Sequence, residues 1–209
     1  MRFLFLILSL ILSRLLYAQE PTTILRSGDL LFQNIDCGEM CDAIEAVTEG
    51  YHGQKFSHMG LVILRNDSVF VIESIGAAVQ LTPYSIFKNR SAHPLFIGRL
   101  KSRYRHLIPQ ALSFCLSQMG VPYDDDFLYN NEKYYCSELI YDAFKNANDD
   151  KPVFALEPMT FKQPGTDVFF PVWQDYYQKL KMPIPQDSLG CNPGGLSRSK
   201  KIKILKEKL

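Results

Sequence analysis

Two apolar runs joined by a short polar link constrain the fold of this chain more than any other feature. The runs cover residues 58–64 and 68–75, and the link between them contains Asn66-Asp67. If Asn66-Asp67 forms a two-residue turn, the runs make a β-hairpin in which Gly60 lies opposite Glu73. The sequence therefore predicts a sheet built around an antiparallel pair of strands.

This register places a histidine beside a carboxylate. Side chains alternate along a strand, so His58 and Glu73 share a face as diagonal neighbours, with Cβ atoms about 7 Å apart. A three-residue turn would move Glu73 to the other face, so the inference depends on the register. Glu73 is also the only charged residue of its strand, and a buried carboxylate needs a partner. The remaining histidines look like surface residues: His52, His93 and His106.

A cysteine stands where an amphipathic helix is expected to begin. Residues 136–144 place Leu139, Ile140 and Phe144 at the spacing of one apolar face, whereas Tyr135 before them does not extend the helix. The first turn of a helix favours a thiolate, which is the nucleophile of covalent catalysis but needs a base. The alternative is that Cys136 is a small buried hydrophobe. The polar and aromatic residues on either side of Cys136 favour a catalytic site over this alternative.

Length and composition indicate one ordinary α+β domain. The chain has 209 residues, 46% hydrophobic and 22% charged, and its net charge of +1 gives no reason to expect nucleic acid as a partner. Besides the hairpin, the patterning predicts strands at 30–33, 79–81 and 95–100 and helices at 41–48, 109–119 and from Thr82-Pro83. The acidic loop 124–126 is expected to be a solvated turn, because it lacks the spaced ligands of a calcium loop. The basic end, residues 199–209, is expected to fray.

The first eighteen residues differ from the rest. Arg2 precedes a short apolar core, and Ala18 is a small residue before a polar one, which is typical of a secretory signal peptide. A retained N-terminal anchor is the alternative. We expect residues 1–18 to be removed and residues 19–209 to be a single exported domain, periplasmic or extracellular in a bacterium, with no stable membrane anchor.

The five cysteines cannot all pair, so at least one thiol stays free in an oxidising compartment. Cys37 and Cys41 are expected to form a local disulfide. A zinc site there is a weaker alternative, because no second cysteine pair and no near histidine accompany them. Cys115 lies in an apolar helical run and is expected in the core.

Four segments occur together in an order that resembles a known family: 28–33 (GDLLFQ), 56–62 (FSHMGLV), 72–73 (IE) and 134–141 (YYCSELIY). The combination resembles the YiiX/YaeF-like hydrolases, permuted members of the NlpC, papain-like superfamily in which the His strand precedes the Cys helix. The resemblance spans about residues 27–145, and the C-terminal third carries no motif of the family. It implies a permuted papain-like/NlpC α+β fold, with a small, mostly antiparallel, barrel-like sheet packed against helices that include the Cys helix.

The resemblance also implies roles for individual residues. Cys136 would be the nucleophile and His58 the general base, and Glu73 would orient the imidazole. The backbone N–H of Cys136 would contribute to the oxyanion hole. Tyr135 and Gln33 are candidate substrate-binding residues. No cofactor or metal is expected.

The function that follows is a secreted cysteine amidase or peptidase. Its expected substrates are small peptides or amino-acid conjugates, above all those of the bacterial cell wall. An alternative is a lipid acyl hydrolase or acyltransferase that uses the same thioester chemistry. A non-catalytic binding module is a third reading, against which the combination of Cys, His and Glu argues.

Overall fold

A computed structural model describes residues 25–206 of the chain. The predicted signal peptide, residues 1–18, lies outside the described residues. Within residues 25–206, no helix is both long enough and apolar enough to cross a membrane.

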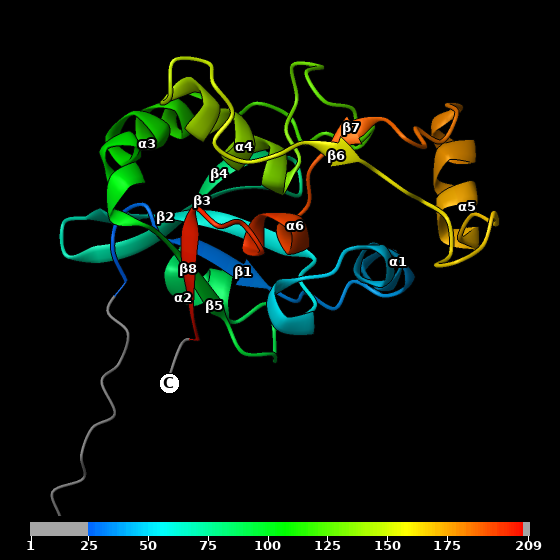
Figure 1. The fold of residues 1–209 in the computed structure, drawn as a ribbon, viewed down its shortest axis with the longest axis horizontal. Coiled ribbons are helices and arrows are strands. Elements are labelled where there is room, and N and C mark those ends of the chain that lie inside the picture. Colours follow the sequence, from blue (N-terminus) through cyan, green and yellow to red (C-terminus); the bar gives the residue numbers. More distant parts are fainter. Residues whose placement is uncertain (1–24, 207–209) are drawn as a thin grey trace, which may run out of the picture.

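The centre of the fold is a six-stranded sheet in which every neighbouring pair is antiparallel (Figure 1). Its strand order is β4-β3-β2-β1-β5-β8. The strands are β1 (Leu30–Gln33), β2 (His58–Arg65), β3 (Ser68–Ile75), β4 (Ala78–Pro83), β5 (Phe96–Leu100) and β8 (Ile202–Lys206). The predicted antiparallel sheet is confirmed, but it stays open at β4 and β8 and is not a closed barrel.

The β2–β3 hairpin has the predicted register. Arg65 pairs with Ser68, and the next pairs continue without a bulge to Leu61 and Ile72. Asn66-Asp67 adopts positive φ angles of 45° and 60°, which is the backbone that a two-residue hairpin turn requires. His58 and Glu73 therefore lie on one face of the sheet.

Helices cover both faces of the sheet. They are α1 (Glu39–Val47), α2 (Tyr84–Lys88), α3 (Ile108–Ser117), α4 (Cys136–Asn146), α5 (Pro171–Leu180) and α6 (Pro193–Ser197), with single 3₁₀ segments at Tyr51–Gly53 and Ser102–Leu107. In Figure 1, α3 and α4 lie together over one face, and α2 lies on the opposite side.

Alternation along the strands divides the core between these two faces. On β1, Leu30 and Phe32 pack with α3 and α4, whereas Leu31 packs with Phe87 of α2. The α4 face contains Leu139, which is fully buried. Burial on both faces fixes the register, because a shift of one residue would exchange the two sets of side chains.

The C-terminal third forms a third cluster beside α1. Phe161 and Trp173 pack edge to face at 5.0 Å between ring centroids, and Tyr177 and Ala43 of α1 complete the buried group. A two-stranded sheet, β6 (Glu157–Pro158) and β7 (Leu189–Gly190), leads from this region to α6. This part of the chain, which carries no recognisable motif, therefore packs against the N-terminal helix.

Three predictions about local structure are wrong. The helix expected from Thr82-Pro83 begins at Tyr84, because both earlier residues still pair in β4. The basic end does not fray through residue 206, since β8 pairs with β5 and buries Ile202 in the main core. The acidic loop is not solvated at Asp124, which is fully buried.

Candidate active site

Cys136 is the first residue of α4, as the sequence predicts. Tyr135 before it has extended backbone angles, φ −84° and ψ 169°, and no side chain caps the helix end. The first backbone N–H groups of a helix have no partner within the helix, so they are available to an anion at this position. The Cys136 side chain is 6% exposed.

His58 links the cysteine to a carboxylate. As the first residue of β2, it lies at the end of the strand, where its ring makes a side-chain hydrogen bond with Cys136. Its Nε2 atom lies 2.6 Å from Oε2 of Glu73. Since Glu73 occupies Nε2, the other ring nitrogen, Nδ1, is the one left for Cys136. The three side chains that the sequence singled out as catalytic therefore form one connected group.

Arg90 extends this group, and no pattern in the sequence indicated its role. Its two terminal nitrogens donate to both carboxylate oxygens of Glu73, each at 2.7 Å. Arg90 lies just after α2 and stacks its guanidinium 5.7 Å from the Phe87 ring centroid. A buried carboxylate needs more partners than one histidine can supply, which predicts a further donor but does not identify this arginine.

The charges of the group are mutually stabilised. Burial opposes the charged form of His58, but hydrogen bonds with Cys136 and Glu73 outweigh it and raise the pKa of His58 to about 9. Burial also opposes ionisation of Glu73, yet the hydrogen bonds from His58 and Arg90 lower the pKa of Glu73 to about 2. At neutral pH an imidazolium ion therefore lies between the carboxylate and the sulfur.

The two candidate substrate-binding residues occupy different places. Gln33 pairs with His58 across β1 and β2, but it is fully buried and its Nε2 donates to the Phe87 carbonyl at 2.9 Å. It supports the His58 side of the site rather than lining the cavity described below. Tyr135 does line that cavity, and its hydroxyl accepts a hydrogen bond from the Cys191 N–H at 3.1 Å.

Other carboxylates near the site serve a different purpose. Glu138 is fully buried, accepts the Asn130 N–H at 2.9 Å, and has a pKa that burial raises to about 8. Asp124 accepts the backbone N–H groups of Asp126 and Leu128 at 3.0 and 2.8 Å. Both residues hold the loop between α3 and α4 in place, and neither contacts His58.

The remaining histidines are exposed, as predicted: His52, His93 and His106.

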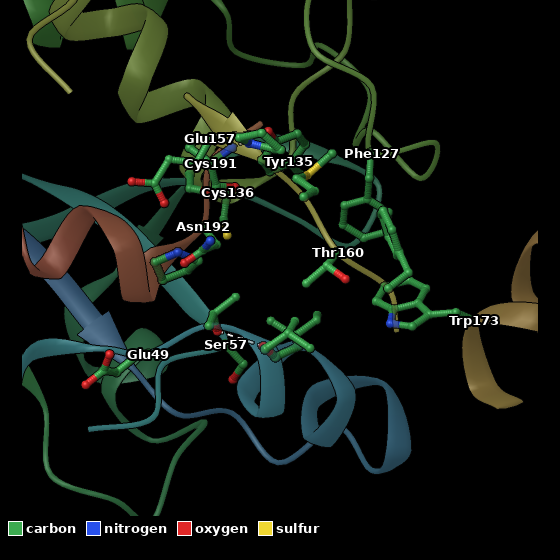
Figure 2. A pocket seen from close by; sticks show the side chains of 18 of the residues that line it. Glu49, Ser57, Phe127, Tyr135, Cys136, Glu157, Thr160, Trp173, Cys191 and Asn192 are labelled. Carbon is green, nitrogen blue, oxygen red and sulfur yellow. Dashed lines mark hydrogen bonds between the residues drawn. The ribbon is translucent and has the colours of Figure 1, made fainter. Parts of the chain in front are cut away.

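Cys136 opens onto a cavity of about 160 Å³ (Figure 2). One wall consists of α1 residues, and the other comes from the loop before α4 and from the C-terminal third. The lining includes Ile44, Val47, Thr48, Ser57, Tyr123, Phe127, Tyr135, Ser137, Met159, Thr160, Phe161, Trp173, Cys191 and Asn192. Glu49 and Arg198 of the lining form a long pair, 3.9 Å apart, and both are largely exposed. The cavity is thus aromatic inside and charged where it meets solvent.

Tyr123 has a hydroxyl close to the sulfur. Burial and the neighbouring Cys136 raise the pKa of Tyr123 well above its ordinary value. Among the described residues, no hydrogen bond partner is found for this hydroxyl, so its proton is available to a ligand. The sequence contained no signal for it, because Tyr123 lies in an irregular loop.

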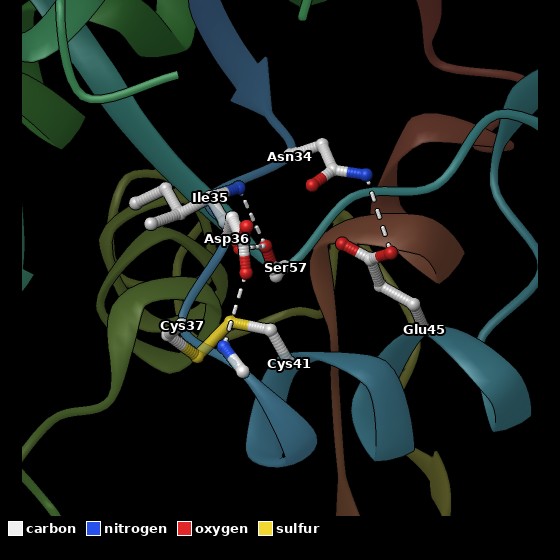
Figure 3. Close-up of a disulfide and its surroundings, with 8 residues drawn as sticks. Asn34, Ile35, Asp36, Cys37, Cys41, Glu45 and Ser57 are labelled. Atoms are coloured by element: carbon white, nitrogen blue, oxygen red, sulfur yellow. Dashed lines mark hydrogen bonds between the residues drawn. A yellow bond between two sulfur atoms is a disulfide. The ribbon is translucent and has the colours of Figure 1, made fainter. Parts of the chain in front are cut away.

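The predicted local disulfide is present and adjoins the cavity wall. Cys37 and Cys41 are joined at the start of α1, next to Ser57, whose hydroxyl accepts the Ile35 N–H at 2.8 Å (Figure 3). The other cysteines are free and buried: Cys115, Cys136 and Cys191. Cys115 lies in the core, as expected, whereas Cys191 lines the cavity.

Within residues 25–206, no three His, Cys, Asp or Glu side chains are grouped so that they could hold a metal ion.

Comparisons with known proteins agree with this geometry. The family described as permuted papain-like amidase enzymes, YaeF/YiiX, C92, matches residues 24–205. The uncharacterized protein YiiX of Escherichia coli strain K12 is 29% identical over 147 residues, which is 68% of this chain and 66% of that protein. The chain therefore matches slightly less than two thirds of the length of this relative.

The fold also resembles a solved structure. A crystal structure of yiiX from Escherichia coli O157:H7, which is described as a metalloprotein, superposes with a TM-score of 0.73 at 19% sequence identity, covering 88% of this chain and 97% of that one. That description concerns the other protein. With the family match spanning residues 24–205, and with Cys136, His58 and Glu73 connected in the order His strand before Cys helix, the chain belongs to the YaeF/YiiX family of permuted papain-like amidases.

Proposed function

We propose that this protein is an exported cysteine amidase in which Cys136 is the nucleophile, His58 the general base and acid, and Glu73 the residue that orients His58. The single observation that carries the proposal is the connected arrangement of Cys136, His58 and Glu73, with Nε2 of His58 2.6 Å from Glu73 and its ring bonded to Cys136. Membership of a family of amidase enzymes supports the reaction type.

The proposed reaction begins with attack of the Cys136 sulfur on the carbonyl carbon of a substrate amide. The negative charge that develops on the carbonyl oxygen is stabilised by the backbone N–H of Cys136 and by the hydroxyl of Tyr123. The His58 imidazolium then gives its proton to the departing nitrogen as the C–N bond breaks. An amine leaves, and the acyl group remains as a thioester on Cys136.

Hydrolysis of the thioester completes the cycle. Neutral His58 takes a proton from a water molecule, whose oxygen attacks the thioester carbonyl, and the sulfur departs as thiolate. The products are a carboxylic acid and the enzyme with the Cys136 sulfur released and His58 again an imidazolium ion. Glu73 carries one negative charge throughout, which keeps the ring oriented in both halves of the cycle.

We further propose small peptides or amino-acid conjugates of the bacterial cell wall as substrates. The predicted signal peptide supports an exported enzyme, and a small cavity with a charged rim suits short peptides. Export is tested by sequencing the N-terminus of the mature protein. A mature N-terminus at Gln19 supports it, and a retained Met1 contradicts it.

The reaction is tested with the mature protein and its Cys136→Ala variant. Both are incubated with peptidoglycan fragments and, separately, with acyl lipids, and the products are identified by mass spectrometry. Amide cleavage by the wild type alone supports the proposal, whereas cleavage only of lipid esters assigns the thioester chemistry to lipids. Equal product formation by Cys136→Ala contradicts the role of Cys136. The thermal transition of Cys136→Ala is expected to be nearly unchanged, since the substitution leaves little cavity.

A further inference from the structure

The cavity beside Cys136 contains one buried hydrogen-bond donor without a partner. The indole nitrogen of Trp173, Nε1, is buried, and no hydrogen-bond acceptor contacts it among the described residues. The Trp173 side chain is 3% exposed and lines the same cavity as Cys136. An indole N–H is a donor only, and leaving it unpaired in a buried place costs free energy.

Two polar side chains of the wall are engaged by backbone carbonyls. The hydroxyl of Ser137 donates to the Cys191 carbonyl at 3.0 Å, and that of Thr48 donates to the Ile44 carbonyl at 2.7 Å. Trp173 therefore presents a free, buried donor to the cavity, in addition to the Tyr123 hydroxyl that the proposed reaction uses. Buried polar groups in proteins nearly always have a partner, and an exception calls for an explanation.

The position of the indole is fixed by its neighbours. Phe127 and Phe161 meet it edge to face at 5.6 and 5.0 Å between ring centroids, and Tyr177 packs at 6.0 Å. These contacts hold the ring without using its nitrogen. In Figure 2, Thr160 lies between the labelled Cys136 and Trp173, so the two residues occupy opposite ends of the lining in this view.

The size of the cavity limits what can reach the indole. A dry cavity of about 150 Å³ holds a benzene molecule, and the cavity here is about 160 Å³. A group of roughly six non-hydrogen atoms therefore fits between Cys136 and the aromatic cluster. Its body must be apolar to match the walls, and an acceptor at its far end would satisfy Nε1.

We infer that Trp173 is a specificity-determining residue that selects amides whose acyl side carries a short apolar stem ending in a hydrogen-bond acceptor, such as a carbonyl oxygen. The inference rests on the proposed function, because the acyl group is the part of the substrate that becomes attached to Cys136. Trp173 binds the remote end of this group and takes no part in bond breaking.

The first test measures binding and needs no turnover. Trp173 is the only tryptophan of the chain, so tryptophan fluorescence reports on this cavity alone. The Cys136→Ala protein is titrated with two primary amides of equal size, 5-oxohexanamide and 5-methylhexanamide, and with homologues one carbon shorter and longer. We expect the keto compound of one length to bind at least tenfold more tightly and to shift the emission to longer wavelength, as an acceptor on the indole N–H does. Equal affinity at all three lengths, or binding without an emission shift, overturns the inference.

The second test measures selectivity in the active protein. The ratio of kcat/KM between the keto and methyl 4-nitroanilides is compared in the wild type, in Trp173→Phe and in Tyr177→Phe. Tyr177→Phe is the matched control, because it removes a hydroxyl that donates to the Asp126 carbonyl at 3.1 Å in the same aromatic cluster but does not line the cavity.

A ratio of ten or more that falls to about one only in Trp173→Phe supports the inference. A ratio that persists in Trp173→Phe, or that is lost equally in Tyr177→Phe, overturns it. If Trp173→Phe does not fold, the fluorescence titration decides the question with the indole intact. The proposed function fails separately, by absence of amide cleavage in the wild type, whatever the two ligands do in the Cys136→Ala protein.

Discussion

At the scale of single residues, the site depends on which carboxylate carries a charge. Glu73 is ionised at neutral pH, because His58 and Arg90 lower its pKa to about 2. Burial instead raises the pKa of Glu138 to about 8. A charged carboxylate stabilises an imidazolium ion much more strongly than a protonated carboxyl group does. The two buried glutamates are therefore expected to respond very differently to the same substitution.

Glu73→Gln is expected to lower kcat about a hundredfold or more and to shift the pH profile. The carboxylate raises the pKa of His58, so its loss lowers that pKa. The imidazolium acid is then lost at lower pH, and the alkaline limb of kcat/KM, expected near pH 9 in the wild type, moves toward neutrality. Glu138→Gln is the matched control and is expected to keep a rate near that of the wild type, because this carboxyl group is largely protonated at pH 7. A rate near that of the wild type in Glu73→Gln, together with a large loss in Glu138→Gln, would show that Glu73 is not the residue that orients His58.

At the scale of secondary-structure elements, the short helix α2 supplies the support behind Glu73. Phe87 packs its ring 5.8 Å from that of His58, and its carbonyl accepts the side-chain amide of Gln33. The chain then turns so that Arg90 reaches both oxygens of Glu73. The five-residue helix α2 and the residues just after it thus contact both His58 and Glu73.

Arg90→Met is expected to lower kcat about tenfold and to move the alkaline limb in the direction opposite to that of Glu73→Gln. Removing the guanidinium leaves the Glu73 charge less neutralised, so the carboxylate stabilises the imidazolium more strongly and the pKa of His58 rises. The rate falls because the carboxylate loses two charge-assisted hydrogen bonds that fix its orientation. Arg90→Lys should recover only part of the rate, since an ammonium group cannot bind both oxygens in the same planar geometry. An alkaline limb that moves to lower pH would contradict this account.

The disulfide acts on α1, which forms a wall of the cavity through Ile44, Val47 and Thr48. The double variant Cys37→Ser/Cys41→Ser is expected to lose about 2 kcal/mol of unfolding free energy at most, because the closed loop is short. It should also raise KM more than it lowers kcat, since the wall lies away from the Cys136–His58 bond. Urea denaturation and steady-state kinetics measure both effects. A fall in kcat at unchanged KM would place the influence of the disulfide on the reacting groups instead.

At the scale of the whole molecule, the end of the chain completes structures that begin near its start. β8 pairs with β5 along the sheet edge, and the C-terminal aromatic cluster packs on α1. The cavity therefore draws on segments from both halves of the chain (Figure 2). We predict that residues 19–209 form one domain. A single cooperative unfolding transition would support this prediction.

Truncation after Ser199 is expected to lower the thermal midpoint by several degrees and to promote association. The loss of β8 removes Ile202 from the main core and exposes the hydrogen-bonding edge of β5. Lys203→Ala, which removes only an exposed side chain of β8, serves as the control and should leave the midpoint nearly unchanged. A truncated protein as stable as the full chain would mean that the end is frayed in solution, as the sequence alone suggested.

The sequence predicted those parts of the molecule that follow from local periodicity. The register of the hairpin followed from a two-residue turn and alternating side chains, and the start of α4 followed from an apolar face that begins at Cys136. Arg90, Tyr123 and Trp173 could not be predicted, because their roles arise from contacts between segments far apart in the chain. The burial of Asp124 was missed for a different reason: its partners lie in its own irregular loop, whose shape does not follow from any periodicity.

The sequence separation of only four residues between Cys37 and Cys41 has a consequence for the order in which an oxidant joins the thiols of this chain. The entropy of closing a loop grows with its length, so an unfolded chain joins Cys37 to Cys41 more readily than it joins either to a cysteine some 75 or more residues away. In the folded protein the three remaining thiols are free and buried in the main core. An oxidising compartment can thus consume the two thiols that close the local loop while the sulfur of Cys136 stays reduced. Rapid formation of the Cys37–Cys41 disulfide thus lowers the chance that either cysteine forms a wrong disulfide with Cys136.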